Sequence, residues 1–408
     1  MIVGDCTITY LSVTTRVGSI LNPRDIDIDA LEADLNALRD ELRADVGAGD
    51  LKHLKKMVRW GHLLTILGYG TAWIAPNPVS VVLMSTAIFG RWAMVAHHII
   101  HRGYDKVPNI PKRFTSKVFA KGWRRAIDWT DWIDPEAWRH EHNTLHHYKL
   151  GEVHDPDQPE HNLEWLRGSS LPRFLRYLVV FLGAITWKII YYPPNAMRTL
   201  YEAQQRRGKN EVPLPESVMD WRVFFPFVQP GVQLWLRSYL PYVLLHYVLI
   251  PLPFLLISQW AYFSVLANRL MAEVLTNLHA FIVIVPNHAG EDLYRFDTAI
   301  EGRGDFYLRQ IVGSTNYRTG GDLNDYLHGF LNYQIEHHVW PDMTMLQYRK
   351  AQPRMAEICR RHGVAYVQES IWVRLRKLLD VLVGKTTMQH WPANAQDSPR
   401  SLAAQETP

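Results

Sequence analysis

The stretch GHLLTILGYGTAWIAPNPVSVVLMSTAIFG, residues 61–90, contains no Asp, Glu, Lys or Arg. Asn77 and the prolines on either side of it divide the stretch into two nearly equal halves. With its flanking residues, each half reaches the roughly 17–25 residues that a helix needs to cross a bilayer. A second uncharged run covers residues 238–268 and is broken near Pro251 and Pro253. Two such runs are hard to place in a soluble core, so we predict a membrane-embedded protein.

The predicted fold is an all-α integral membrane domain with four transmembrane helices in two hairpins and a cytosolic helical cap. We expect the spans at about 58–75, 79–97, 239–257 and 260–287. The apolar segment at about 174–192 contains Arg176 and Lys188 and many aromatic residues, which is typical of a helix that lies in the membrane interface. An interfacial position also keeps the loops before and after this segment on one side of the membrane.

The distribution of charge predicts the orientation. Residues 102–149 are rich in Lys and Arg, whereas the turns inside both hairpins carry no charge. Because basic loops favour the cytosolic side, we expect both termini and the long loops in the cytosol and the protein in the inner (cytoplasmic) membrane. The expected divisions are a cytosolic segment, 1–56, with an acidic amphipathic helix over 27–45; the membrane domain, 57–385; and a disordered tail, 386–408.

The composition argues against several classes of site and partner. The 44 Lys and Arg residues against 40 Asp and Glu give a net charge of +4, too balanced to indicate a nucleic-acid binder. Two cysteines, Cys6 and Cys359, cannot build a disulfide framework, an iron–sulfur cluster or a cysteine-based zinc site. The 19 histidines are the excess that needs an explanation.

The histidines cluster where the cytosolic ends of the hairpins are expected. Three motifs carry them: AHHIIHRGYD at 96–105, WRHEHNTLHHYKL at 138–150 and LNYQIEHHVWPDM at 331–343. Residues four apart on a helix share one face, so such a pair can bind the same metal. The candidate ligands, which include a histidine just after the last span, are His97, His101, His142, His146, His147, His288, His337 and His338.

Eight imidazoles exceed the four ligands that one zinc ion takes, and they suit two metal ions with open positions for oxygen or water. Imidazole binds iron, copper, zinc and nickel alike; we favour non-haem iron, with zinc as the second choice. Six further histidines are expected to pack in the protein interior, to face solvent or to support the ligands: His98, His140, His154, His161, His279 and His328.

Taken together, the three motifs resemble the histidine boxes of the membrane fatty acid desaturases: HHIIH as an HxxxH box, HNTLHH as an HxxxHH box and QIEHH as the third. The resemblance covers roughly residues 58–345 and includes two spans before each group of boxes. It implies O2-dependent desaturation of a fatty acyl chain, as free acid, thioester or lipid-linked group, in a membrane of lipids. It also implies two iron ions at the cytosolic face, held by the eight histidines.

Residues around the boxes are candidates for supporting roles. Gln334 stands where many family members have His, so it is a candidate weak or water-mediated ligand. His98 and Asn277 are candidate outer-shell residues, and Arg269 with Glu273 has the i, i+4 spacing of a helical ion pair. Carboxylates that are candidates for holding the imidazoles in one tautomer are Asp134, Glu141, Asp155, Asp157, Asp322 and Glu336.

The reaction needs an electron source, because reducing O2 to water takes two electrons beyond those removed from the substrate. The sequence has no dinucleotide-binding fingerprint, haem motif or cysteine cluster. We therefore expect an external carrier of the ferredoxin or cytochrome b5 type with its reductase. The basic stretch 102–149 either attracts an acidic carrier or sets topology and contacts lipid headgroups.

Other functions remain open at this point. The same scaffold supports acyl hydroxylation, acetylenation, and oxidative decarboxylation of a fatty acid to a terminal alkene, because small changes in substrate position select among them. A membrane zinc hydrolase is a more remote alternative, and eight ligands without an HExxH motif argue against it. In a metal transporter, the histidines are expected to line the spans rather than cluster at one face.

Overall fold

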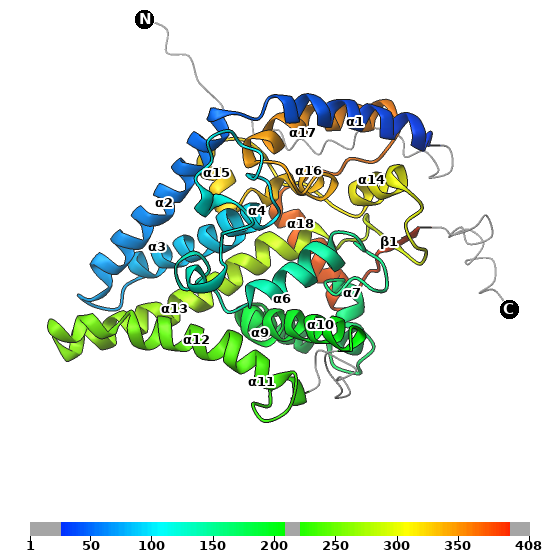
Figure 1. The fold of residues 1–408 in the computed structure, drawn as a ribbon. Coiled ribbons are helices and arrows are strands. Elements are labelled where there is room, and N and C mark those ends of the chain that lie inside the picture. Colours follow the sequence, from blue (N-terminus) through cyan, green and yellow to red (C-terminus); the bar gives the residue numbers. More distant parts are fainter. Residues whose placement is uncertain (1–25, 209–220, 392–408) are drawn as a thin grey trace, which may run out of the picture.

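The computed structural model describes residues 26–208 and 221–391, which are mostly helical (Figure 1). In Figure 1 the long helices of the two hairpins converge at the lower left, whereas α1 (Ile28–Ala44) and α17 (Met345–Arg361) pack together across the top. The strands β1 (Tyr294–Phe296) and β2 (Gln389–Trp391) form a small parallel sheet at the right.

Three helical stretches among the described residues are long and apolar enough to cross a membrane: Pro78–Ile100, Gly231–Leu256 and Gln259–Asn287. They contain nearly all of the expected spans 79–97, 239–257 and 260–287. The first joins α3 (Pro78–Phe89), the π-helical η2 (Gly90–Ala96) and α4 (His97–Ile100). The second joins α11 (Gly231–Leu234), η7 (Trp235–Tyr239), α12 (Leu240–Val243), η8 (Leu244–Leu249) and η9 (Leu252–Leu256). The third joins α13 (Gln259–Ile284) and η10 (Val285–Asn287).

Most of the first expected span, 58–75, lies in α2 (Ala48–Ala72), which begins ten residues before that span and ends three residues before its end. The N-terminal half of α2 carries Lys55, Lys56 and Arg59, so α2 is not among the three helices that qualify as spans. It packs along α3 as the first half of a hairpin. The fourth transmembrane helix therefore stays a prediction.

The expected interfacial segment, 174–192, forms α9 (Arg173–Ile190). A bend of 51° separates it from α10 (Tyr192–Arg206), and the pair counts as a further span only if both helices belong to one broken crossing. The outer face of α9 exposes Phe174, Leu178 and Phe181, as a helix in contact with lipid does. Its interfacial position stays a prediction.

Buried polar side chains join the tips of the two hairpins. Asn77 begins α3 and accepts a hydrogen bond from the Ser80 amide at 2.8 Å, as an N-cap residue does. Asn268 of α13 reaches across to this turn, donating to the Ala72 carbonyl at 2.9 Å and accepting from the Asn77 amide at 2.9 Å. The tips of the two hairpins therefore pack against each other. The other ends of the hairpins, which carry the histidine motifs, also lie close together.

Helices α1 and α17 pack together, and α17 contacts the third histidine motif; we call these two helices the cap, and its cytosolic position stays a prediction. The expected acidic helix over 27–45 forms α1, and its buried leucines face α17 and α14 (Arg303–Val312). Beyond the elements already given, the described chain contains η3 (Lys112–Phe114), η4 (Gly122–Arg124), α5 (Arg125–Asp128), α6 (Pro135–His140), the π-helical η5 (Glu141–His146), α7 (Pro159–Asn162), α8 (Glu164–Arg167), η6 (Trp221–Phe224), α15 (Asp322–Leu327), η11 (Leu331–Tyr333), α16 (Gln334–Val339) and α18 (Ile371–Leu382).

The first residues of the expected tail at 386–408, as far as residue 391, lie within the described structure. Residues 389–391 pair with β1, and the Gln389 amide donates to the Leu293 carbonyl at 2.9 Å. The ring of Trp391 packs on the ring of Tyr294 with centroids 5.2 Å apart, so an apolar contact holds this otherwise polar segment against β1. Residues 392–408 lie outside the described residues.

Candidate metal centre

Two π-helical segments present the first two boxes. η2 leads directly into His97, and η5 contains His142 and His146. π-helical turns are rare and frequently mark functional sites, because the wider turn shifts side chains out of the ordinary helical register. The third box lies on α16, so each box is held by a short helical segment rather than by a loop.

The structure brings all eight predicted ligands into two buried groups whose ligating atoms lie within 4.8 Å of one another. The first group is His97, His101, His142, His147 and His337. The second group is His146, His288 and His338. Each group therefore contains histidines from more than one motif, as expected for two neighbouring metal ions held by the same segments of the chain.

Hydrogen bonds to Nδ1 of two histidines in the first group indicate that their Nε2 atoms are free to bind a metal ion. The Nδ1 atom of His97 lies 3.2 Å from the Ala93 carbonyl, and Nδ1 of His337 lies 3.2 Å from the Tyr348 hydroxyl. Tyr348 itself donates to the Trp340 carbonyl at 3.0 Å, so it accepts from His337. Both Nε2 atoms then carry lone pairs, yet they lie 3.0 Å apart. A cation between them removes this repulsion, so the donor set fits a metal ion.

The second group has the same arrangement. Nδ1 of His146 donates to the Asp155 carboxylate at 2.9 Å, and Nδ1 of His338 to the Gln310 amide oxygen at 2.9 Å. The Nε2 atom of His338 is buried without a hydrogen-bond partner, as is Nε2 of His101 in the first group. Buried polar atoms rarely lack a partner, and a metal ion supplies one.

The protonation states also suit metal binding, which requires neutral imidazoles. Burial lowers the pKa of His101, His147, His337 and His338 well below the ordinary value, and neighbouring histidines lower each pKa further. His146 differs: burial lowers its pKa, but the charge and hydrogen bond of Asp155 outweigh burial, so the pKa is raised. Asp155 therefore both orients this ring and holds its Nδ1 proton.

Gln334 and Trp138 contact the histidines directly. The Gln334 side-chain nitrogen lies 2.8 Å from Nε2 of His288, and its side-chain oxygen is buried without a partner. Gln334 thus lies at the second group, where its role as a weak or water-mediated ligand stays a prediction. The ring of Trp138 stacks on that of His142 with centroids 4.5 Å apart and fills the space beside box two.

His98 and Glu141 are buried next to predicted ligands in the chain, and their outer-shell roles stay predictions. The ring of His98 lies 5.2 Å from that of His97, and its Nδ1 is 2.6 Å from the Met94 carbonyl. Glu141 is fully buried, and burial, with the nearby Asp157 carboxylate, raises its pKa well above the ordinary value. Asp157 itself lies within 4.8 Å of the ligating atoms of His142 and His146.

Asp322 and Asn277 lie elsewhere. Asp322 forms ion pairs with Lys56 of α2 and Arg349 of α17. Its carboxylate is therefore held by these two cations and not by the histidines. The outer-shell role expected for Asp322 is not supported. Asn277 hydrogen-bonds the Lys188 amide and Glu273 within the bundle. Gln310 and Tyr348, which orient two ligands, were not predicted, since nothing in their sequence context links them to the boxes.

A cavity of about 460 Å³ adjoins the metal centre. Four of the eight histidines, His97, His142, His146 and His288, form one wall. The other walls are almost entirely apolar and aromatic, and α9 supplies one side of them; they include Trp92, Leu163, Val180, Trp187, Phe281 and Leu331. We call this space the acyl cavity, because a long apolar ligand is what such walls accommodate.

A second cavity, of about 710 Å³, lies beside the acyl cavity. Asn162 and Trp165 line both, so the two spaces share a border. The basic side chains that line the second cavity are Lys149, Arg198, Arg206 and Arg207. Its two carboxylates are engaged by partners, Asp155 by His146 and Glu202 by Arg198, which leaves the cavity with a positive character. We call it the basic cavity.

Comparison with known proteins agrees with this geometry. The fatty acid desaturase family model matches residues 71–370. The chain belongs to the fatty acid desaturase family. It is 23% identical over 399 residues to the NADPH-dependent stearoyl-CoA 9-desaturase of Mycobacterium tuberculosis, which covers 95% of this chain and 87% of that protein.

Other relatives match shorter stretches of this desaturase. The acyl-lipid (9-3)-desaturase of Physcomitrium patens is 31% identical over 112 residues, 28% of this chain and 20% of that protein. A fatty acid desaturase 2-like protein of Mus musculus is 35% identical over 71 residues, 17% of this chain and 14% of that protein. The expectation of an oxidoreductase of lipid metabolism is therefore confirmed.

Proposed function

We propose that this desaturase introduces a double bond into a saturated fatty acyl chain, with O2 as co-substrate and two iron ions held by the eight histidines. The acyl cavity carries the proposal, because one of its walls is the histidine cluster and the others are apolar. A methylene pair of a chain in this cavity would lie beside the histidines that would hold the metal ions, as hydrogen removal requires. Bound iron supplies the oxygen chemistry that breaks an unactivated C–H bond.

The chain's own residues position this chemistry. Asp155, Gln310 and Tyr348 accept hydrogen bonds from ligand imidazoles and hold each ring in one tautomer. Trp92 and Trp187 form part of the acyl cavity wall, which excludes water and limits the paths that an acyl chain can take. Specificity for a methylene position then depends on where these walls hold the chain.

For electron supply we propose NADPH as the source, because the M. tuberculosis relative is named NADPH-dependent. An external carrier of the ferredoxin or cytochrome b5 type with its reductase would deliver the electrons. Lys and Arg in residues 102–149 favour a docking face in the cytosol, and the positive-inside rule supports the same orientation for an inner-membrane protein.

Product analysis tests the proposed reaction. The full-length chain, expressed in a bacterial host without an oxygen-dependent desaturase of its own, is supplied with saturated acids of defined length. We expect monounsaturated acids of unchanged length by mass spectrometry, and none without O2. Hydroxylated acids or terminal alkenes shortened by one carbon would instead indicate the related oxidations, and hydrolysis products would indicate the zinc hydrolase.

A substitution in the acyl cavity provides the next prediction. Gly183 of α9 lines the cavity, and a β-carbon there would meet no atom within 4 Å. Gly183→Leu is expected to fill this space and lower kcat/KM for stearoyl-CoA by roughly 10–200-fold, with a smaller loss for shorter chains. The matched control is Gly70→Leu, at a glycine of α2 with equally open space that does not line the cavity. Equal activity of both variants on long chains would contradict this use of the cavity.

We also propose that the substrate is a thioester with an anionic head, because the basic cavity borders the acyl cavity. The variant Arg206→Glu/Arg207→Glu is expected to raise KM for stearoyl-CoA about tenfold at low salt, with kcat little changed. The control is Arg360→Glu/Arg361→Glu, an adjacent arginine pair at the end of α17. An unchanged KM would argue for an uncharged head or a different entry route.

A further inference from the structure

Four charged side chains lie buried inside the bundle, away from the metal centre. Lys188 and Arg269 are fully inaccessible to solvent, and Asp131 and Glu273 are nearly so. Charged groups that are buried away from water are costly unless they are paired and hydrogen-bonded. None of the four belongs to the histidine groups or is accounted for by the proposed reaction.

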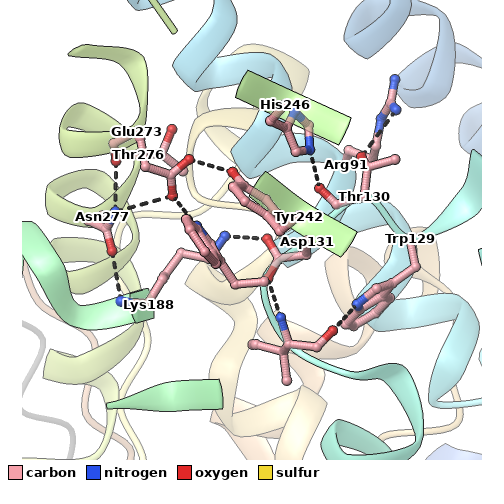
Figure 2. Close-up of polar contacts among 12 residues, drawn as sticks. Arg91, Trp129, Thr130, Asp131, Lys188, Tyr242, His246, Glu273, Thr276 and Asn277 are labelled. Carbon is pink, nitrogen blue, oxygen red and sulfur yellow. Dashed lines mark hydrogen bonds and ion pairs between the residues drawn. The ribbon is translucent and has the colours of Figure 1, made fainter. Parts of the chain in front are cut away.

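The four residues form one connected unit, which we call the polar bridge; Figure 2 shows three of them, Lys188, Asp131 and Glu273. Lys188 forms an ion pair with Asp131, and Arg269 with Glu273 at 2.9 Å. The indole of Trp132, the neighbour of Asp131, donates to Glu273 at 2.7 Å. The bridge thus joins α9, α13 and the segment between α5 and α6.

Asn277 closes the polar bridge from the other side. Its side-chain oxygen accepts a hydrogen bond from the Lys188 backbone amide at 2.7 Å, and its side-chain nitrogen donates to the Glu273 carbonyl at 2.8 Å. Figure 2 shows Asn277 between these two residues. The end of α9 is therefore fixed to α13 through the backbone of Lys188, and to the segment between α5 and α6 through its side chain.

One end of the polar bridge holds the wall of the acyl cavity. The Lys188 ammonium lies over the ring of Trp92, 4.3 Å from its centroid, which is the geometry of a cation–π contact. Trp92 lines the acyl cavity, and so do Trp187 and Ile190 on either side of Lys188. A displacement of Lys188 therefore moves surfaces that an acyl chain would touch.

The other end holds the second histidine box. Asp131 precedes Asp134, which caps α6 by accepting from the Ala137 amide at 3.0 Å. α6 carries Trp138, whose ring stacks on His142. The same ion pair is thus connected to the cavity wall on one side and to a predicted metal ligand on the other.

We propose that the Lys188–Asp131 pair is a positioning pair that acts through Trp92 to set which methylene of the acyl chain faces the metal centre. The inference rests on the proposed function. It assigns regioselectivity to a buried ion pair that touches neither the metal ligands nor the reacting carbon. A merely structural pair would change the amount of folded protein, whereas a positioning pair also changes the position of the double bond.

The test compares product isomers in cells that express the full-length chain and are supplied with octadecanoic acid. The variants are Lys188→Met and Asp131→Asn, with Lys188→Arg as the conservative replacement that retains the charge. Lys350→Met is the matched control, because Lys350 forms an exposed ion pair with Asp45 on the cap. Protein amount and iron content are measured with double-bond position, which is read by mass spectrometry after derivatisation of the alkene.

We expect the wild type and Lys350→Met to yield the same main isomer. Lys188→Met and Asp131→Asn are expected to retain iron, to lose on the order of tenfold or more in rate, and to form neighbouring isomers in substantial amounts. Lys188→Arg is expected to restore the main isomer. Iron-loaded variants with the wild-type isomer pattern would overturn the inference.

Trp92→Phe provides a second route to the same test, because it leaves both ion pairs in place and changes only the wall on which Lys188 acts. If the charge variants do not accumulate, a shifted isomer pattern in Trp92→Phe supports the inference and an unchanged pattern overturns it. If the iron-loaded wild type forms no unsaturated product at all, the proposed function fails instead, so the two failures are distinguishable.

Discussion

His338→Ala is expected to abolish product formation and to reduce bound iron to about one ion per chain. His338 belongs to the group of three histidines, so its loss leaves two imidazoles in that group. Its Nδ1 atom is held by Gln310, and its Nε2 atom is buried without a partner, which is the arrangement of a metal ligand. Iron is measured by mass spectrometry of the purified protein, alongside products from the same preparation.

The control for this substitution is His62→Ala, at an exposed position of α2 outside both histidine groups. It is expected to retain wild-type iron and activity, since alanine is well tolerated on an exposed helical surface. If His338→Ala also retained full iron and activity, the third box would not belong to the metal centre, and the assignment of the second group would be wrong.

Asp155→Asn is expected to lower iron affinity or activity by roughly 10–100-fold, the usual effect of losing a residue that orients a metal-bound histidine. Asp155 accepts from Nδ1 of His146 at 2.9 Å and from the Gly151 amide at 2.9 Å, so it fixes both the ring and the loop behind it. Iron affinity is measured by competition with a chelator.

The pH dependence of iron affinity distinguishes a loss of His146 ring orientation from a change in His146 protonation. Burial lowers the pKa of His146 while Asp155 raises it, so replacing Asp155 lowers that pKa and makes the neutral imidazole easier to form. A weaker affinity in Asp155→Asn that persists at higher pH therefore reflects lost orientation. Asp105→Asn is the control, because Asp105 also orders a loop, by accepting from the Ser116 amide at 2.7 Å. Equal iron affinity in the two variants would contradict the role of Asp155.

The sequence predicted which histidines cluster better than how they divide into groups. Helical spacing pairs His97 with His101, and these two share the first group. The same spacing pairs His142 with His146, but the structure places them in different groups, because they lie on the π-helical η5, whose wider turn changes the helical register. The division into groups of five and three depends on how four distant segments meet, the three boxes and the segment that carries His288. No local pattern contains that information, so it could not be predicted.

The differences between the sequence-based predictions and the structure have physical reasons. Asp322 is close to the third box in sequence, but Lys56 and Arg349 draw its carboxylate to the cap. Gln310 reaches His338 from α14, 28 residues away, and no periodicity marks it. The helix α2 extends ten residues before the expected span 58–75, because its charged N-terminal half continues the helix and packs against the cap.

The measurement that tests the account most directly is the metal content of the purified, full-length wild-type protein. Both histidine groups are buried, Nε2 atoms of the first lie 3.0 Å apart, and acceptors hold Nδ1 of ligands in each group, which predicts about two iron ions per chain. Both ions should be removed by a strong chelator, with loss of the oxygen-dependent product. One zinc ion per chain, with no iron and undiminished activity, would contradict the account.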